Sequence, residues 1–404
     1  MDCVLCADIG SSSLKAALIN ADGKVLAYSK QSLGTGDSDR AAEEWEAALG
    51  RAVTDISQSS PCKAQALCIS GNGPTVVSDT GETLLWSRRI DEEHGASLFI
   101  PRLKAFRKIY PQAWSRSRYV FSGPEFLIWR LTGTPCTILP EERFLPAYWS
   151  DGALEDAGFS SVERGKLPPF LFPSNLAGTV KSGVTGIADG TPVYCGAPDF
   201  VSALVGTGTL KPGLLCDRAG SSEGINLCTD FPLKADGIRT LPSVIPGLWN
   251  AGALIKESGS RFIEYKKRTE TATGRAVNFT DLVHGSLYGG KEFSEGREIL
   301  GSLADNVRSA VETLRTAWSA SCGKPFPESM TVTGGQAANP EWSQFKADVT
   351  GLCINVMEIP DAELAGDAVM AFTGAGHFSS LTHAAESLCR VRRSFIPRKG
   401  GVAP

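Results

Sequence analysis

The chain has 404 residues, 42% of them hydrophobic, and a formal net charge of -4. This length allows two domains with full-sized cores, so neither a disulfide framework nor a structural metal is needed. The slight negative charge, with Lys and Arg spread along the chain, argues against nucleic acid and anionic membranes as partners. The 11 cysteines lie mostly in apolar runs, and we interpret them as reduced core residues of a cytoplasmic protein. We expect no secretion signal and no membrane-spanning segment.

The first predicted element is a β-meander with strands over residues 3–7, 14–19 and 25–29. Asp8 stands at the end of the first strand and opens the turn Asp-Ile-Gly-Ser-Ser-Ser. Glycine lets the backbone approach a phosphate, and amide and hydroxyl groups can donate to its oxygens. The carboxylate of Asp8 can hold Mg²⁺ directly or through water. An ordinary Gly/Ser hairpin is the alternative interpretation of this turn.

The next predicted elements are a helix over residues 41–57 and a buried strand over residues 64–69. A loop at 70–75 leaves this strand and carries Asn72, whose amide could bond a hydroxylated ligand, although a plain Asn-Gly turn is comparably consistent. Residues 88–93 are charged and are expected mostly on a solvated face. A further helix is predicted to begin at Ser122-Gly123-Pro124-Glu125 and to end at Gly133.

The middle of the chain holds the candidate catalytic residue, Asp199. A short apolar strand at 191–194 is broken by small residues and a proline, and a helix is expected over residues 201–206. A strand that ends in such a turn displays its acid at the carboxyl edge of a sheet, where clefts form in α/β proteins. The alternative is that Asp199 only caps the helix. We place the boundary between two domains, 1–198 and 199–404, at this point.

The second half repeats the pattern of strand, small polar turn and strand over residues 214–228, which suggests an ancient internal duplication. Later elements include a loop at 269–274 and a frayed tail after residue 398. Between a strand and a helix, Gly334 and Gly335 would let the backbone meet a flat or anionic ligand closely, or would form a loop without a ligand. The small residues around Gly366 permit close packing beside a nucleotide or another helix. The remaining predictions are helices over 299–318, 341–350 and 363–376 and strands over 329–333 and 353–357.

Four stretches now stand in one order: residues 8–13, 196–199, 219–222 and 333–337. This order resembles the FGGY carbohydrate kinases, which share the actin-like ATPase fold. Lesser matches support the resemblance, which covers nearly the whole chain; they are residues 127–133, 167–169 and 340–342. It implies an α/β fold of two actin-like (ribonuclease H-like) domains with an interdomain cleft, the second domain being shortened.

The resemblance also implies an ATP-dependent kinase that uses Mg²⁺ to phosphorylate a hydroxyl of a small sugar or polyol, with a homodimer as one assembly to consider. Asp199 matches the family's general base, and Asp8 matches the acid near Mg²⁺. A hydroxyl is a poor nucleophile until its proton has an acceptor, and phosphoryl transfer otherwise needs mainly positioning and charge stabilisation. The residues that match the two phosphate loops and the adenosine motif are Gly10, Ser11, Ser12, Ser13, Gly220, Ser221, Ser222, Gly334, Gly335 and, nearby, Gly366.

The sequence departs from the family at the expected acceptor site. The loop at residues 70–75 reads Ser-Gly-Asn-Gly-Pro-Thr, where pentulose kinases often have Ser-Gly-Gln-Met-His-Gly. In the family's Trp-x-Asp-x-Arg stretch, Arg88 replaces the acid, which could favour an acidic or phosphorylated substrate. Asn72 and Arg88, with Asp199, are therefore the predicted substrate-binding residues.

The family's Pro-Tyr-x-x-Gly-Glu-Arg stretch is not found between residues 253 and 299, and the chain is shorter than usual. A non-catalytic nucleotide- or sugar-binding sensor or subunit is therefore the rival interpretation. The presence of both Asp8 and Asp199 argues against it. A heat-shock-type ATPase is disfavoured because the chain has no separate peptide-binding module.

Overall fold

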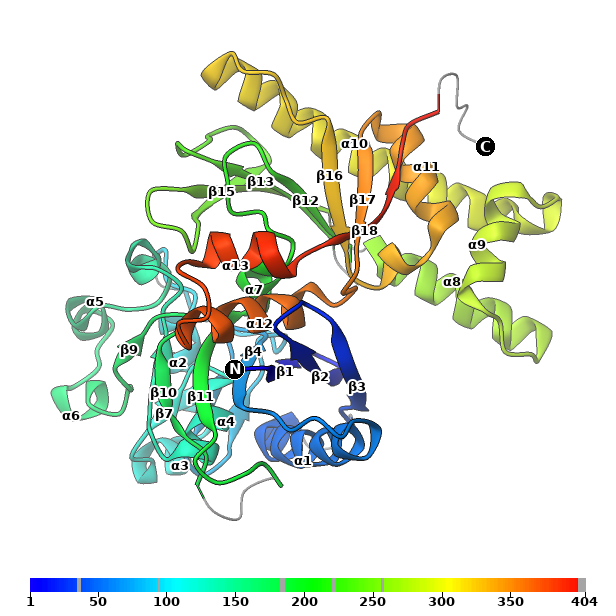
Figure 1. The fold of residues 1–404 in the computed structure, drawn as a ribbon. Coiled ribbons are helices and arrows are strands. Elements are labelled where there is room, and N and C mark those ends of the chain that lie inside the picture. Colours follow the sequence, from blue (N-terminus) through cyan, green and yellow to red (C-terminus); the bar gives the residue numbers. More distant parts are fainter. Residues whose placement is uncertain (35–37, 94, 182–185, 220–222, 256–257, 399–404) are drawn as a thin grey trace. The chain divides into compact units, whose positions relative to one another are not determined.

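The computed structural model describes residues 1–34, 38–93, 95–181, 186–219, 223–255 and 258–398 (Figure 1). Contacts between Cα atoms divide the chain into two compact units. The first unit comprises residues 1–206 and 363–388, and the second comprises residues 207–362 and 389 onward. Residues 363–388, expected in the second domain, thus pack with the first unit. The domain boundary after residue 198 stays a prediction.

The first unit is built on a six-stranded sheet in the order β10-β11-β4-β1-β2-β3 (Figure 1). The strands β11, β4 and β1 are parallel, and the remaining pairs are antiparallel. Every residue of β1 and β4 is buried, as is typical of parallel strands with both faces covered. The bounds are β1 Cys3–Ile9, β2 Ser13–Asn20, β3 Val25–Ser32, β4 Ala66–Gly71, β10 Leu176–Thr179 and β11 Pro192–Pro198.

Helix α1 (Ala41–Ser59) packs on β2 and β3 through an apolar stripe that includes Trp45, Leu49 and Val53. Helix α4 (Glu125–Thr132) ends at Gly133, whose φ of 72° is the left-handed cap that the sequence predicted. The other helices are α2 Ile100–Ile109, α3 Pro111–Arg116, α5 Asp151–Asp156, α6 Ser161–Arg164, α7 Asp199–Gly206, α12 Ala362–Gly374 and α13 Leu381–Leu388. Short strands form two small sheets: β5 Val76–Ser78, β6 Thr83–Leu84, β7 Val120–Phe121, β8 Thr137–Ile138 and β9 Phe170–Leu171.

The second unit has a seven-stranded sheet in the order β14-β15-β13-β12-β16-β17-β18. Its strands β12, β16 and β17 are parallel, and an antiparallel meander continues the sheet from β12 through β13 to β15. The first sheet has the same arrangement in β1, β2 and β3, so the predicted repeat of the strand pattern is confirmed. The bounds are β12 Leu215–Ala219, β13 Glu223–Thr229, β14 Ile238–Pro242, β15 Trp249–Ile255, β16 Ser329–Thr333, β17 Cys353–Met357 and β18 Val391–Phe395.

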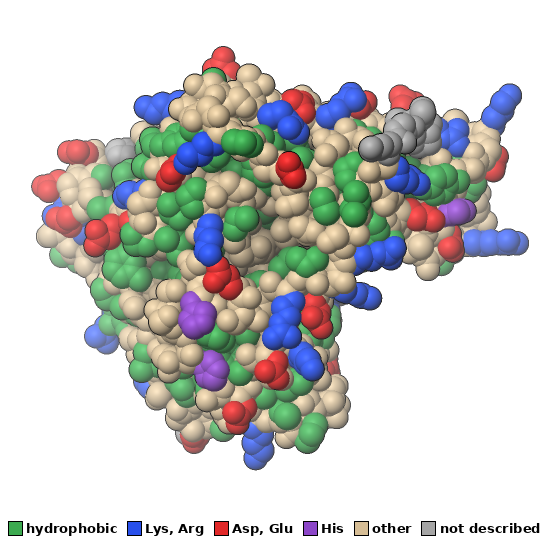
Figure 2. Space-filling view, turned by 45° about the horizontal axis from the view of Figure 1, so that its top comes forward, with side chains coloured by type: hydrophobic (Ala, Val, Ile, Leu, Met, Phe, Trp, Pro, Cys, Tyr) green, Lys and Arg blue, Asp and Glu red, His purple; other side chains and the backbone are tan. Residues whose placement is uncertain are grey.

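The long amphipathic helix α10 (Ser294–Cys322) covers this second sheet through Val307, Val311 and Leu314. Its first turns instead join a separate apolar cluster with α8 (Ser258–Thr273), α9 (Phe279–Tyr288) and α11 (Pro340–Thr350). On the face of the molecule shown in Figure 2, Lys and Arg side chains are interspersed with Asp and Glu side chains. Among the helices of the described ranges, none combines the length and the hydropathy needed to cross a membrane.

Most predicted elements are confirmed, but the loop expected over residues 269–274 is wrong, because α8 continues to Thr273. Its polar side chains bond within the helix. The hydroxyls of Thr269 and Thr273 donate to carbonyls four residues earlier, and Lys266 pairs with Glu270 at 2.5 Å. The exposed face at residues 88–93 is confirmed in outline. The predicted tail after residue 398 lies outside the described residues.

Candidate active site

Three neighbouring strands of the first unit bring the predicted acids to one edge of a sheet. In the parallel register of β1 and β4, Asp8 stands opposite Ser70, and Pro198 of β11 stands opposite Gly71 of β4. Asp199 follows β11 directly and Asn72 follows β4 directly. The carboxyl ends of parallel strands meet at the same edge, which is where α/β proteins bind ligands.

The predicted phosphate turn at residues 10–13 joins β1 to β2. The amide of Gly10 donates to the carbonyl of Ser13 at 3.0 Å, which closes the turn. A neighbouring strand also holds it, since the amide of Leu33 donates to the carbonyl of Ser12 at 2.9 Å. Ser11 and Ser12 are exposed, whereas Ser13 is buried. The turn therefore presents two hydroxyl-bearing residues on a fixed backbone.

The hydroxyl oxygen of Ser11 connects this turn to the loop at residues 70–75. It accepts hydrogen bonds from Nδ2 of Asn72 at 3.4 Å and from Nε1 of Trp86 at 3.3 Å. The carbonyl oxygen of the Asn72 side chain is buried and has no hydrogen-bond partner in the described structure. Trp86 is 41% exposed and presents part of its ring to solvent. The sequence placed Trp86 only in a family motif, and the structure adds it to the site.

Asp199 is the first residue of α7 and is partly exposed. Its Oδ1 accepts a hydrogen bond from the amide of Phe200 at 2.6 Å, so the carboxylate satisfies one backbone donor at the start of the helix. This contact is compatible with the capping alternative, but the residue also stands at the strand edge shared with Asp8. A capping bond and a chemical role are not mutually exclusive for a carboxylate.

A buried carboxyl group, that of Asp367 on α12, lies behind the strand edge and was not among the predicted residues. Its Oδ2 is 2.9 Å from the hydroxyl of Ser70, and that hydroxyl is 3.4 Å from Oδ1 of Asp8. The side chain is fully buried. Burial, and then the charge of Asp8, hold the pKa of Asp367 well above its usual range. In the sequence the only signal was one acid in a helix of small apolar residues.

Arg88, the predicted substrate residue, lies in an exposed polar cluster. Its Nη1 donates to Oδ1 of Asp39 at 2.8 Å and contacts the hydroxyl of Tyr110 at 2.8 Å. Burial, followed by the hydrogen bond to Asp39, raises the pKa of Tyr110. In this arrangement the guanidinium is already bound by groups of the protein itself.

In the second unit, the predicted adenosine motif is a tight turn after β16. Gly334 has a φ of 88°, a left-handed conformation that favours glycine, and its amide contacts the carbonyl of Pro360 at 3.3 Å. Asn339 caps α11 by accepting from the amide of Trp342 at 2.9 Å. The indole of Trp342 donates to Oε1 of Gln336 at 2.7 Å. The turn is thus tied to the helix that follows it.

A buried charged network lies beside this turn. Nζ of Lys346 is 2.6 Å from Oδ2 of Asp217 and also contacts Oε1 of Glu223. Glu223 accepts from Ser258, which in turn accepts from Nε2 of Gln336 at 3.3 Å. All three charged side chains are almost completely buried. This cluster was not predicted from the sequence.

Two opposing influences set the protonation of this network. Burial and the neighbouring Glu223 raise the pKa of Asp217 well above its usual range. Burial also acts to raise the pKa of Glu223, but Lys346 and the hydrogen bonds outweigh it and lower that pKa. Likewise, the carboxyl groups outweigh burial and raise the pKa of Lys346. The pKa shifts of Asp217 and Glu223 thus run in opposite directions, and both carboxyl groups contact the one ammonium of Lys346 in a dry site.

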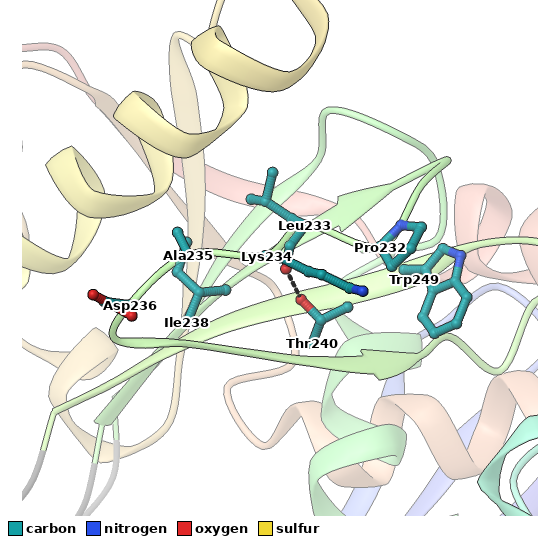
Figure 3. Close-up of a pocket in the computed structure, with 8 residues that line it drawn as sticks. All are labelled: Pro232, Leu233, Lys234, Ala235, Asp236, Ile238, Thr240 and Trp249. Carbon is teal, nitrogen blue, oxygen red and sulfur yellow. Dashed lines mark hydrogen bonds between the residues drawn. The ribbon is translucent and has the colours of Figure 1, made fainter.

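Gly366, the predicted second phosphate loop and one pocket remain to be placed. Gly366 packs against α7 in the first unit, where a Cβ would lie 2.0 Å from the carbonyl oxygen of Ser202. Gly220, Ser221 and Ser222 lie outside the described residues. A pocket of about 750 Å³ in the second unit (Figure 3) contains none of the predicted site residues. Within the described ranges no three His, Cys, Asp or Glu side chains form a metal-binding group.

Comparisons with known proteins find similarity to one domain family and to several kinases. Residues 276–375 match the model of the C-terminal domain of the FGGY family of carbohydrate kinases. The autoinducer-2 kinase of Enterobacter sp. (strain 638) is 25% identical over 296 residues, which cover 62% of this chain and 54% of that protein. The chain therefore spans about half the length of the curated relatives of this kind. The xylulose kinase of Bacillus subtilis (strain 168) is 20% identical over 497 residues, covering 100% of this chain and 94% of that protein.

Among solved structures, the xylulose kinase from Lactobacillus acidophilus has a similar fold. Its TM-score is 0.76 at 16% sequence identity, and the match covers 99% of this chain and 94% of the other. This likeness confirms the predicted α/β fold of two actin-like domains. Residues 276–375 are thus similar to the C-terminal domain of the FGGY family of carbohydrate kinases, and the fold of the chain is similar to that of solved sugar kinases.

Proposed function

We propose that the chain transfers the γ-phosphoryl group of ATP to a hydroxyl of a small sugar or polyol, with Mg²⁺ as the metal. The observation that carries this proposal is the register that sets Asp8, Asn72 and Asp199 at one edge of the first sheet. The relatives' activities support the same reaction class. The acceptor's identity stays open at the level of sugar or polyol.

Within this proposal Asp199 accepts the proton of the attacking hydroxyl, because a hydroxyl becomes a competent nucleophile only when its proton has an acceptor. Asp8 offers the oxygen ligand that Mg²⁺ prefers, and one carboxylate together with phosphates and water is a common Mg²⁺ site. When bound, the metal neutralises charge on the phosphates. The Gly10–Ser13 turn would donate to phosphate oxygens from its amides and hydroxyls.

The acceptor would lie against Asn72 and Trp86. Oδ1 of Asn72 has no hydrogen-bond partner in the described structure, and a turn of the side chain toward solvent would let it accept a hydrogen bond from a hydroxyl of the substrate. The hydroxyl of Ser11 already accepts two N–H groups, so its own hydrogen can be donated outward. The exposed indole of Trp86 offers a flat apolar face to a sugar ring. Arg88 as a further acceptor residue stays a prediction.

In the second unit, Gly334 and Gly335 would approach the adenosine, since a Cβ at Gly335 would meet no atom within 4 Å. The network through Gln336 holds this turn from behind. The assignment of Gly366 to this pocket, and of Gly220, Ser221 and Ser222 to a second phosphate loop, rests on the family resemblance alone. The interdomain cleft and a homodimeric assembly likewise stay predictions.

A coupled ADP-release assay over pentuloses, hexuloses, polyols and acidic sugars tests the proposal. We expect turnover on at least one acceptor. No turnover on any acceptor, with ATP binding intact by calorimetry, would instead favour the non-catalytic sensor or subunit that the altered 70–75 loop suggests.

The variant Asp199→Ala tests the proposed base. We expect it to keep ATP affinity within a few-fold and to lower turnover by at least about a hundredfold, as the loss of a general base does. Near-normal turnover in this variant would remove Asp199 from the mechanism.

A further inference from the structure

The buried carboxyl of Asp367 connects two parts of the first unit that the proposed reaction needs at a fixed separation. On one side, its Oδ2 lies 2.9 Å from the hydroxyl of Ser70, which contacts Asp8. On the other side, its Oδ1 lies 3.4 Å from the hydroxyl of Ser202 in α7. The same Ser202 hydroxyl is 3.4 Å from the carbonyl oxygen of Ala197, two residues before Asp199.

The carboxyl group of Asp367 lies where α12, β11 and α7 come close together. A Cβ at Gly196 would lie 3.2 Å from Oδ1 of Asp367 and 2.2 Å from the carbonyl oxygen of Ile69. A Cβ at Gly366 would lie 2.0 Å from the carbonyl oxygen of Ser202. Both glycines therefore permit the contacts that bring α12 against β11 and α7. A larger residue at either position would push the carboxyl away from both serines.

We propose that Asp367 is a positioning residue that fixes Asp8 through Ser70 and the Asp199 turn through Ser202. The expected effect of Asp367 on the reaction rests on the proposed kinase function, because Asp8 and Asp199 would act together in phosphoryl transfer. Asp367 lies behind the strand edge and is fully buried, so its side chain offers no surface to a substrate. Its effect is to hold two acting groups in place, and misplacement of such groups by about 1 Å can cost about a hundredfold in rate.

The hydrogen-bonding capacity of the two serines explains why the group at position 367 must be polar at both ends. The hydroxyl of Ser70 has one hydrogen to share between the carboxyl groups of Asp8 and Asp367. An amide at position 367 can donate to Ser70 and accept from Ser202, so it preserves both links. A methyl group preserves neither. An Asn at position 367 should therefore preserve the links to both serines, whereas an Ala should not.

The test measures hydrogen–deuterium exchange and steady-state kinetics on the full chain, with ATP and the acceptor that gives the highest turnover in the panel. For Asp367→Ala we expect about tenfold faster exchange in peptides covering residues 8–13 and 196–202, with residues 299–318 unchanged. We expect kcat to fall about thirtyfold and both KM values to stay within threefold. Asp367→Asn should remain within about threefold of the wild type in every measurement.

Single-link variants and a matched control separate positioning from general loss of stability. Ser70→Ala should loosen only residues 8–13, and Ser202→Ala only residues 196–202, which keeps the test decisive if Asp367→Ala does not fold. The control is Asp79→Ala, because Oδ2 of Asp79 accepts from the amides of Arg118 and Tyr119 elsewhere in this unit. Its kcat should not change.

The outcomes distinguish this inference from the proposed function. Unchanged exchange in both peptides, or a loss of kcat in Asp367→Asn equal to that in Asp367→Ala, would overturn the positioning role. So would faster exchange spread evenly over the first unit. A wild-type protein without turnover would refute the kinase proposal, while the exchange results would still decide whether Asp367 holds the two segments.

Discussion

Replacing Lys346 with Met removes the only cation that contacts the buried carboxyl groups of Asp217 and Glu223 in the described structure. Lys346 is 1% exposed and both partners are fully or almost fully buried, so water cannot take its place. Met has a similar length and fills most of the same space. The substitution therefore changes charge much more than packing.

The expected cost follows from the burial of the partner left behind. Breaking a buried ion pair by removing one partner costs about 3–5 kcal/mol, because an uncompensated charge remains in the interior. In a unit of this size, 1 kcal/mol corresponds to about 2–4 °C in Tm. We expect the transition of the second unit to fall by about 6–20 °C in scanning calorimetry.

The loss should depend on pH, and its sign can be worked out. In the wild type the pKa of Glu223 is lowered, so its contribution to stability is present above its unfolded pKa and is lost on acidification. Without Lys346, burial raises the pKa of Glu223 above the unfolded value. The variant then loses stability as the pH rises through that pKa. The difference in Tm between wild type and variant should accordingly be larger at about pH 8 than at about pH 5.

Two further variants control the reasoning. Lys266→Met removes a partner of Glu270 from a much more exposed pair in the same unit, and should lower the transition far less than Lys346→Met does. The double variant Lys346→Met with Glu223→Gln removes the cation together with one of the two carboxyl groups that it contacts, and should recover at least about half of the loss. A Lys346→Met protein destabilised by under about 1 kcal/mol, or equally at both pH values, would refute the charge argument.

Two other substitutions test the packing and capping described above. Gly196→Ala should destabilise the first unit by at least about 2 kcal/mol in urea unfolding, because its Cβ would lie 2.2 Å from a backbone oxygen, whereas Gly152→Ala on exposed helix α5 should be neutral or stabilising. Equal effects at both positions would contradict the geometry. Asn339→Ala should lower the free energy of unfolding by about 1 kcal/mol, because the cap of α11 is lost. Asn339→Asp can still accept from the amide of Trp342 and should keep most of that stability. An Asp variant as unstable as the Ala variant would show that the cap does not operate.

Local signals explain why much of the fold could be predicted from the sequence. The strand expected over residues 353–357 has those bounds in the structure, and the helix expected over 341–350 begins one residue earlier. Gly133 ends its helix as predicted, because a left-handed cap needs glycine. The prediction of a loop at 269–274 failed because α8 packs through Phe262 and Tyr265, and such tertiary packing overrides the weak helix propensity of threonine.

The edge strands β14 and β18 were not predicted, because pairing with a neighbouring strand, and not a pattern in their own residues, makes them strands. Strand β18 reads Val-Arg-Arg-Ser-Phe, and four of its five residues are exposed. Only its antiparallel pairing with β17 identifies it as a strand. The charged side chains that hide this strand from sequence analysis are typical of edges that must avoid pairing with other chains.

The buried polar networks of both units could not be predicted from the sequence, because their members are far apart along the chain. Asp8 and Asp199 could be singled out because each follows a strand, which is a local pattern. By contrast, Ser70 and Asp367 are 297 positions apart, and Asp217 and Lys346 are 129 positions apart. A buried charged or acidic group is tolerated only where such partners meet it, so its partner must be known before its burial can be inferred.

Two glycines mark the place where the backbone passes close to the carboxyl of Asp367. Gly196 and Gly366 have no room for a side chain there. Close packing against Ser202 is therefore a sufficient physical reason for glycine at position 366.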